Sequence, residues 1–237
     1  HRVLCGDATK KEDVERLMDG NKADMVFTDP PYGMNLDTDY TKMDSGLNSF
    51  KQAKGLKANN RVWKQVEGDD RDFDPTHIFE YFNCNEMFLW GADYYSDKII
   101  DRRDGSWLVW DKRVDEKFDK MFGSGFELCW SKTKHKREIL RVRFGGIFGT
   151  ETQDTRKRVH PTQKPLQLIE KIIGKYSKEN GNVIDIYLGS GSTLIACEKT
   201  NRKCYGMEID PHYCDVIVKR WEEYTGNKAE RIEAASA

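Results

Sequence analysis

Short apolar runs alternate with segments of helical periodicity along most of the chain. Seven runs have the length of β-strands and end near Gly, Asp or Pro: residues 2–5, 24–28, 86–90, 107–110, 126–130, 183–186 and 204–208. Apolar residues recur at helical spacing in residues 10–18, 165–176, 193–200 and 211–224. The last of these helices has Asp210 as its N-cap, Pro211 at its first position and Gly226 as its stop signal. The alternation predicts an α/β fold with a doubly wound, mostly parallel sheet.

Two segments interrupt this pattern. Residues 34–75 carry fifteen charged side chains, eight acidic and seven basic, with little periodicity. A loop of this length is usually functional or disordered, and we expect a surface excursion there. Residues 131–160 contain nine Lys or Arg against three acids, and Phe144, Phe148 and several glycines lie among them. A solvated surface explains such a run by itself, but the interleaved aromatic residues favour a nucleic-acid contact.

The composition adds few constraints. The chain has 237 residues, 38% of them hydrophobic, which is enough for one large domain with a core. Its 39 basic and 40 acidic residues leave a net charge of −1, so a polyanion would have to bind a local patch. The six cysteines form no CxxC pair and the five histidines form no HExxH motif, so we expect reduced thiols and no metal site. No apolar stretch approaches the ~20 residues that span a bilayer, and we expect no membrane contact.

The strand at residues 24–28 is followed by Asp29, Pro30, Pro31 and Tyr32. Proline has a fixed φ and no N–H, so the carbonyl groups of Asp29 and Pro30 stay free to accept hydrogen bonds from a ligand. Free acceptors beside an aromatic ring suit the amino group of adenine or cytosine. An ordinary turn at the end of a strand would use the same residue types, so the four residues alone leave both interpretations open.

Residues 183–193, VIDIYLGSGST, read as a strand, a glycine turn and the start of a helix. Gly189 and Gly191 let the backbone approach a ligand closely, and this is typical of a nucleotide-binding βα unit. Glu208 follows Asp185 by 23 residues, near the spacing of a ribose-binding carboxylate. The turn lacks the third glycine of GxGxxG and has no GK[ST], so a nucleoside cofactor without phosphates fits it best.

Four motifs occur together: CGDA at residues 5–8, DPPY at 29–32, HPTQKP at 160–165 and the DxxxGSGST loop from Asp185. In combination they closely resemble the S-adenosylmethionine-dependent DNA amino-methyltransferases, which methylate adenine N6 or cytosine N4. Their order is similar to that of the β class, and the likeness runs from Cys5 to about Ala229. The resemblance implies a Rossmann-like class I methyltransferase sheet of about seven strands in a single catalytic domain, residues 1–237. Residues 34–75 would form an inserted loop facing the active site and DNA, and 131–160 a target-recognition segment.

The resemblance also implies a role for individual residues. Asp29, Pro30, Pro31 and Tyr32 would be catalytic, and S-adenosyl-L-methionine would be the cofactor. Its adenine would meet Asp7 and Ala8, its ribose would meet Glu208, and Lys164 would lie near its carboxylate. The remaining cofactor-binding residues would be Asp29, Asp185, Tyr187, Gly189, Ser190, Gly191, Ser192, Thr193 and Ile209. The DNA-binding residues would be Lys132, Lys134, Lys136, Arg137, Arg141, Arg143, Arg156, Lys157 and Arg158.

One motif departs from the family's usual DPFxGSG. Ile186 replaces the proline and removes a rigid turn, and Tyr187 replaces the phenylalanine and adds a hydroxyl group that needs a partner. We expect these two replacements to affect the affinity for the cofactor without abolishing its binding.

The resemblance favours N6 of a flipped adenine in duplex DNA as the methyl acceptor, because DPPY is more often associated with adenine and SPPY with cytosine. Three alternatives stay open: an N4-cytosine enzyme, an RNA methyltransferase, and an inactive cofactor-binding module that binds DNA. Cytosine C5 methylation is disfavoured because it needs a cysteine nucleophile, and no cysteine follows a proline here. We expect a cytoplasmic prokaryotic or phage protein, with a homodimer left open.

Overall fold

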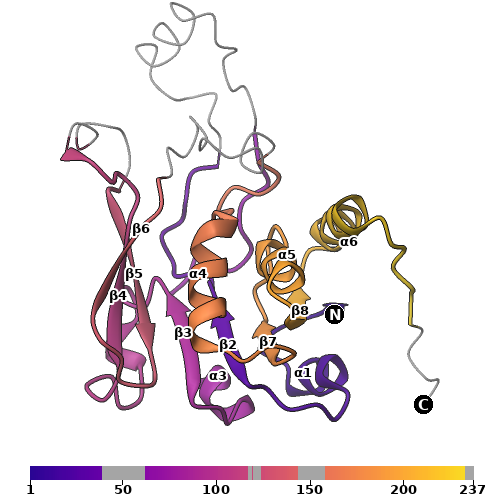
Figure 1. The fold of residues 1–237 in the computed structure, drawn as a ribbon, viewed down its shortest axis with the longest axis horizontal. Helices are drawn as coiled ribbons and strands as arrows, with labels where there is room; N and C mark the ends of the chain where they lie inside the picture. Colours follow the sequence, from indigo (N-terminus) through magenta and orange to yellow (C-terminus); the bar gives the residue numbers. More distant parts are fainter. Residues whose placement is uncertain (39–61, 117–118, 120–123, 144–157, 233–237) are drawn as a thin grey trace, which may run out of the picture.

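A single mixed sheet forms the centre of the molecule (Figure 1). The structure is a computed structural model, and it describes residues 1–38, 62–116, 119, 124–143 and 158–232. In this part of the chain eight strands follow the order β1-β8-β7-β2-β3-β5-β4-β6. Their bounds are β1 Arg2–Cys5, β2 Met25–Thr28, β3 Glu86–Trp90, β4 Ser106–Asp111, β5 Phe126–Ser131, β6 Glu138–Arg141, β7 Asn182–Asp185 and β8 Lys203–Glu208. Only β5 runs antiparallel to its neighbours, β3 and β4.

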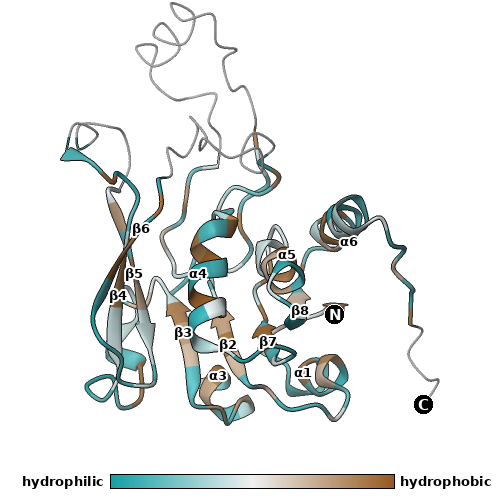
Figure 2. Ribbon diagram, viewed as in Figure 1, coloured by the Kyte–Doolittle hydropathy of each residue, from teal (hydrophilic) through white to brown (hydrophobic). Residues whose placement is uncertain are grey.

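Helices cover both faces of this sheet. Their bounds are α1 Lys11–Met18, α3 Thr76–Tyr81, α4 Leu166–Tyr176, α5 Ser192–Lys199 and α6 Pro211–Thr225, with a 3-10 turn η2 at Ser96–Lys98. Consecutive residues of a strand point to opposite faces. Accordingly, Met25 and Phe27 of β2 pack in the core that holds α4 and α5, whereas Val26 packs in the core that holds α1 and α3. Figure 2 shows the hydrophobic colour on the central strands. The predicted doubly wound α/β fold is confirmed.

The predicted elements agree with the structure at most boundaries. All seven predicted strands are present, and α1, α4, α5 and α6 begin and end within one residue of the predicted helices. Helix α6 has the expected caps: the Asp210 side chain accepts a hydrogen bond from the backbone N–H of His212, and Gly226 has a φ of 77°.

Strand β6, helix α3 and the 3-10 turn η2 are the described elements that the sequence did not predict. β6 lies at one edge of the sheet, where Ile139 and Arg141 are exposed and their neighbours are half-buried. Its charged residues lie within the basic segment 131–160, so the sequence has no apolar run there that would predict a strand. Within the described residues, no helix is long and apolar enough to cross a membrane.

Candidate active site

The four carboxylates that the sequence pointed to lie at one edge of the sheet. Asp185 and Glu208 end β7 and β8, Asp29 follows β2, and Asp7 follows β1. These four strands are parallel neighbours, so their carboxyl ends meet at one edge, called the carboxyl edge below. The opposite edge is the amino edge.

A cavity of about 790 Å³ opens at the carboxyl edge. All but one of the predicted catalytic and cofactor-binding residues line it, so the structure brings the DPPY residues and the glycine turn together. Gly191 is the exception among them. It has a φ of 77°, and a Cβ there would lie 3.0 Å from Ile217 of α6. This glycine therefore serves helix packing at the turn.

Asp185 joins three parts of the site. Its carboxylate accepts hydrogen bonds from the Thr28 hydroxyl at 2.8 Å, the Thr193 hydroxyl at 2.6 Å and the Tyr187 backbone N–H at 3.2 Å. Burial raises the pKa of Asp185 to about 6, although the two hydroxyl groups act in the opposite direction. Asp185 thus ties the end of β2 to the start of α5.

Glu208 organises the glycine turn. Its carboxylate accepts hydrogen bonds from the Gly189 N–H at 2.8 Å and the Asp210 N–H at 3.0 Å. Gly189 has a φ of 53°, a conformation that favours glycine. Burial raises the pKa of Glu208, against the hydrogen bonds that favour its ionised form. A carboxylate held in this way keeps further lone pairs for a ligand's hydroxyl groups.

Tyr187, the departure noted in the sequence, has a hydrogen-bond partner. Its hydroxyl group lies 3.0 Å from Nε2 of His77, and its ring packs edge-on against Phe73. His77 belongs to α3, so its place in the site could not be anticipated. Burial lowers the pKa of His77, which favours the neutral ring. The hydroxyl group that Tyr187 adds is therefore accommodated.

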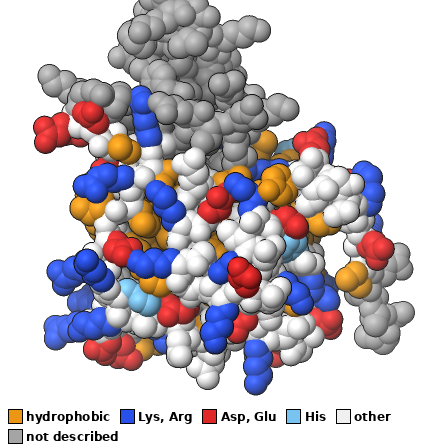
Figure 3. Space-filling model, in the orientation of Figure 1, with side chains coloured by type: hydrophobic (Ala, Val, Ile, Leu, Met, Phe, Trp, Pro, Cys, Tyr) orange, Lys and Arg blue, Asp and Glu red, His pale blue; other side chains and the backbone are white. Residues whose placement is uncertain are grey.

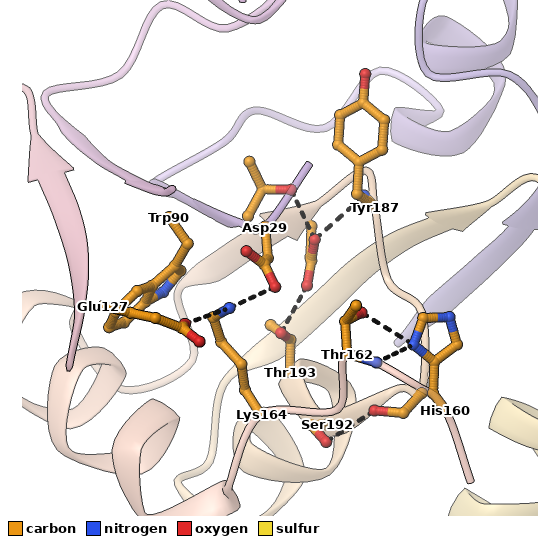
Figure 4. Close-up of polar contacts among 12 residues, drawn as sticks. Asp29, Trp90, Glu127, His160, Thr162, Lys164, Tyr187, Ser192 and Thr193 are labelled. Atoms are coloured by element: carbon orange, nitrogen blue, oxygen red, sulfur yellow. Dashed lines mark hydrogen bonds and ion pairs between the residues drawn. The ribbon is translucent and has the colours of Figure 1, made fainter. Parts of the chain in front are cut away.

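The carboxylate of Asp29 has two different environments (Figure 4). Oδ2 receives the Lys164 ammonium at 2.5 Å, whereas Oδ1 is buried and has no hydrogen-bond partner among the described residues. Burial raises the pKa of Asp29, and the Lys164 charge opposes this shift. Burial alone would lower the pKa of Lys164, but the neighbouring carboxylates raise it, so the ammonium stays charged.

Lys164 also contacts a second acid that sequence reasoning missed. Its Nζ lies 3.2 Å from Oε2 of Glu127, and Glu127 also forms an ion pair with Lys112. Burial would raise the pKa of Glu127, but these two ammonium groups lower it, and the acid stays ionised. An acid inside the apolar run at residues 126–130 was the signal that could have identified it.

The ring of Tyr32 is held by its neighbours. It stacks on Tyr94 with ring centroids 4.9 Å apart and planes 18° from parallel. The backbone of Gly91 also lies against it, since a Cβ on that residue would come within 2.3 Å of the ring. Only glycine fits this position.

The described part of the excursion at 34–75 returns to the cavity. The buried carboxylate of Asp69 accepts hydrogen bonds from the backbone N–H groups of Gly33, Met34 and Leu36, at 2.9 to 3.1 Å. It thereby fixes the chain directly after DPPY.

The predicted DNA-binding residues do not share one edge. Lys132, Lys134, Lys136 and Arg137 connect β5 to β6 at the amino edge, where the Lys132 ammonium binds the carbonyl group of Cys84. Figure 3 shows basic side chains mixed with acidic ones over this view of the molecule.

The other predicted basic residues lie elsewhere. Arg141 ends β6 at the carboxyl edge, where its Nε lies 3.6 Å from Asp111, and Arg143 follows it. Arg158 donates a hydrogen bond to the carbonyl group of His160. Arg156 and Lys157 lie outside the described residues. Among the residues that can be placed, no group of three His, Cys, Asp or Glu could hold a metal ion.

Known proteins resemble this chain in sequence and in fold. An N6/N4 methylase family model, described as DNA methylase, matches residues 57–219. The type II methyltransferase M.HpaI of Haemophilus parainfluenzae is 26% identical, over 95% of this chain and 76% of that protein. The crystal structure of an M1.HpyAVI-SAM complex has a TM-score of 0.53 and 22% identity, covering 93% of this chain and 98% of the other. The cytosine-N4-specific PvuII DNA methyltransferase has a TM-score of 0.52 and 15% identity, covering 92% and 85%.

Proposed function

The chain belongs to the DNA methylase family, and from this premise we propose that it methylates N6 of a flipped adenine in duplex DNA, with S-adenosylmethionine as the methyl donor. DNA methyl transfer with this donor is the activity of the family. The choice of adenine rests on the DPPY motif at residues 29–32, and N4 of cytosine is the alternative. The proposed layout is a single catalytic domain over residues 1–237, with a DNA-facing loop at 34–75 and a target-recognition segment at 131–160.

The residues of the cavity fit the proposed cofactor. A nucleoside with a methionine tail needs a carboxylate that binds its ribose hydroxyl groups. It also needs a glycine turn at which the backbone can approach the ligand closely. Glu208 and the turn at Gly189 meet these needs, and Asp7 lies at the end of the neighbouring strand β1. Tyr187 adds an aromatic wall, with its hydroxyl group satisfied by His77. The bound cofactor supplies an activated methyl group, so the protein needs no nucleophile of its own.

Asp29 carries the chemistry in this proposal. The lone pair of a base amine is delocalised into the ring, which makes the amine a poor nucleophile. Oδ1 of Asp29 and the carbonyl group of Pro30 would accept the two amine hydrogens and direct the lone pair toward the methyl group. Lys164 holds the other oxygen at 2.5 Å and favours the ionised carboxylate. The unpartnered, buried Oδ1 is the observation that carries this role.

The base must leave the duplex to reach Asp29. Flipping costs a few kcal/mol, and stacking on Tyr32 would return ~1 to 3 kcal/mol. Contacts between basic residues and phosphate groups would contribute further. Among the predicted DNA-binding residues, Arg141 and Arg143 lie at the same edge as Asp29, and we assign the DNA-facing surface to that edge.

The substitution Asp29→Ala tests the assignment. Methyl incorporation into duplex DNA should fall by at least ~100-fold, because the amine loses its charged acceptor. The dissociation constant for S-adenosylmethionine, measured by calorimetry, should stay close to that of the wild type. A rate within about tenfold of wild type would contradict the role of Asp29.

A further inference from the structure

A row of four side-chain charges of alternating sign lies at the proposed amine acceptor. It runs from Lys112 to Glu127, from Glu127 to Lys164, and from Lys164 to Asp29. The four residues come from four segments: Lys112 follows β4, Glu127 lies in β5, Lys164 precedes α4 and Asp29 follows β2. Figure 4 shows Glu127 and Asp29 on either side of the Lys164 ammonium.

The surroundings of these charges are aromatic, and the four side chains are mostly buried. The Lys164 ammonium lies 5.1 Å from the ring centroid of Trp90, and the Lys112 ammonium lies 5.0 Å from that of Trp110. The two Trp rings pack edge-on against each other. A buried charge lowers stability unless an opposite charge accompanies it. Each of the four charged side chains is therefore stabilised by its neighbours in the row. The side chain of Lys164 is only 8% exposed and is shared by two carboxylates.

We propose that Glu127 is a positioning residue for methyl transfer: it shares the Lys164 ammonium, so that Lys164 holds Oδ2 of Asp29 and leaves Oδ1 to accept the substrate amine. The inference rests on the proposed function, because it assigns a partner to the same site. Lysine has three N–H donors and no fixed geometry. With Glu127 on its other side, the ammonium lies between the two acids: it donates a hydrogen bond to Asp29 and forms an ion pair with Glu127. Without Glu127, the ammonium turns wholly to Asp29 and competes with the amine for its lone pairs.

The charges around Asp29 give the inference a signature that packing alone would not produce. Lys164 and Lys112 favour the ionised form of Asp29, and Glu127 disfavours it. The other titratable groups that interact with Asp29 are Tyr32, Tyr95, Cys129 and Asp185. Removing the charge of Glu127 should therefore lower the pKa of Asp29, whereas removing that of Lys164 should raise it.

The experiment compares Glu127→Gln with Glu170→Gln in the full chain. Glu170 is the matched control, because it forms an ion pair with Lys199 of α5 and does not line the cavity. Single-turnover transfer of labelled methyl groups to unmethylated duplex DNA should slow by about 10- to 100-fold in Glu127→Gln. It should stay within about twofold of wild type in the control. The dissociation constant for S-adenosylmethionine should stay unchanged in both.

A second readout does not depend on turnover. NMR titration of labelled Asp carboxyl carbons, with Asp29 assigned by its loss in Asp29→Asn, should show a lower pKa for Asp29 in Glu127→Gln and a higher one in Lys164→Met. If Glu127→Gln does not fold, the pair Lys112→Met with Glu127→Gln removes both charges together and should show the same slow transfer.

The outcomes separate the two claims. An unchanged transfer rate in Glu127→Gln, or a pKa of Asp29 that does not fall, overturns the positioning role even if the wild type methylates adenine. A wild type that transfers no methyl group to DNA overturns the proposed function, and the NMR titration then still decides whether Glu127 controls the environment of Asp29.

Discussion

Asp29 and His160 are two polar residues of the site with buried side-chain atoms. Oδ1 of Asp29 is buried without a partner among the described residues, and such an atom costs stability unless something else repays it. His160 is buried as well, and its Nδ1 accepts hydrogen bonds from the backbone and hydroxyl groups of Thr162. The unpartnered Oδ1 is a feature of a site that a ligand completes, whereas Nδ1 of His160 already has its partners in Thr162.

The charge state of His160 predicts how stability depends on pH. Burial, aided by the charge of Arg158, lowers its pKa from 6.5 to about 4. Between these pH values the unfolded chain binds a proton that the native protein does not, so His160 stabilises the fold above pH 6.5 and loses this contribution as the pH falls toward 4. Through His160, acidification from pH 6.5 to below pH 4 lowers the free energy of unfolding by about 3 kcal/mol in total.

Asp185 acts in the opposite direction in an overlapping window, because burial raises its pKa from 3.8 to about 6. The measurement is therefore a comparison of urea unfolding in wild type and His160→Asn from pH 7 to pH 4. We expect the wild type to lose more stability than the variant on acidification. Parallel curves would contradict a neutral, buried His160.

At the scale of elements, the sequence predicted those parts that carry their own local signal. Helix α6 has Asp210 and Gly226 at its ends, and the buried strands are short apolar runs. Helix α3 has six residues, of which only Ile78 is buried, so it has no periodicity to detect. The ion pairs of Glu127 depend on strand order, which brings β5 next to β3, and no local pattern encodes that order.

Position relative to strand β6 determines which basic residues can contact the same DNA as Asp29. The residues directly before β6 lie at the amino edge, and those directly after it lie at the carboxyl edge with Asp29. We expect Arg141→Gln with Arg143→Gln to weaken binding to duplex DNA and to reduce the salt dependence by about 1 to 2 in the logarithmic slope. Lys134→Gln with Lys136→Gln removes the same charge at the amino edge and is the control. Fluorescence anisotropy at several salt concentrations measures both, and an equal loss in the two variants would contradict our DNA surface.

Across the whole molecule, the site depends on convergence of distant segments. Thr28, which precedes Asp29, and Asp185 are 157 residues apart and share a hydrogen bond of 2.8 Å, because β2 and β7 are neighbours. The DPPY residues and the glycine turn therefore line one cavity. Sequence motifs predicted this meeting, because parallel strands present their carboxyl ends at one edge. They could not predict that Lys164 would contact Asp29 through a 2.5 Å ion pair.

The central claim is that this cavity joins a methyl donor to the amino group of adenine. The most direct test is mass spectrometry of nucleosides from the DNA of a methylation-deficient host that expresses the protein. We expect N6-methyladenine in cells with the wild type and none in cells with Asp29→Ala at equal protein levels. N4-methylcytosine in place of N6-methyladenine, or unmodified DNA with the wild type, would contradict the claim.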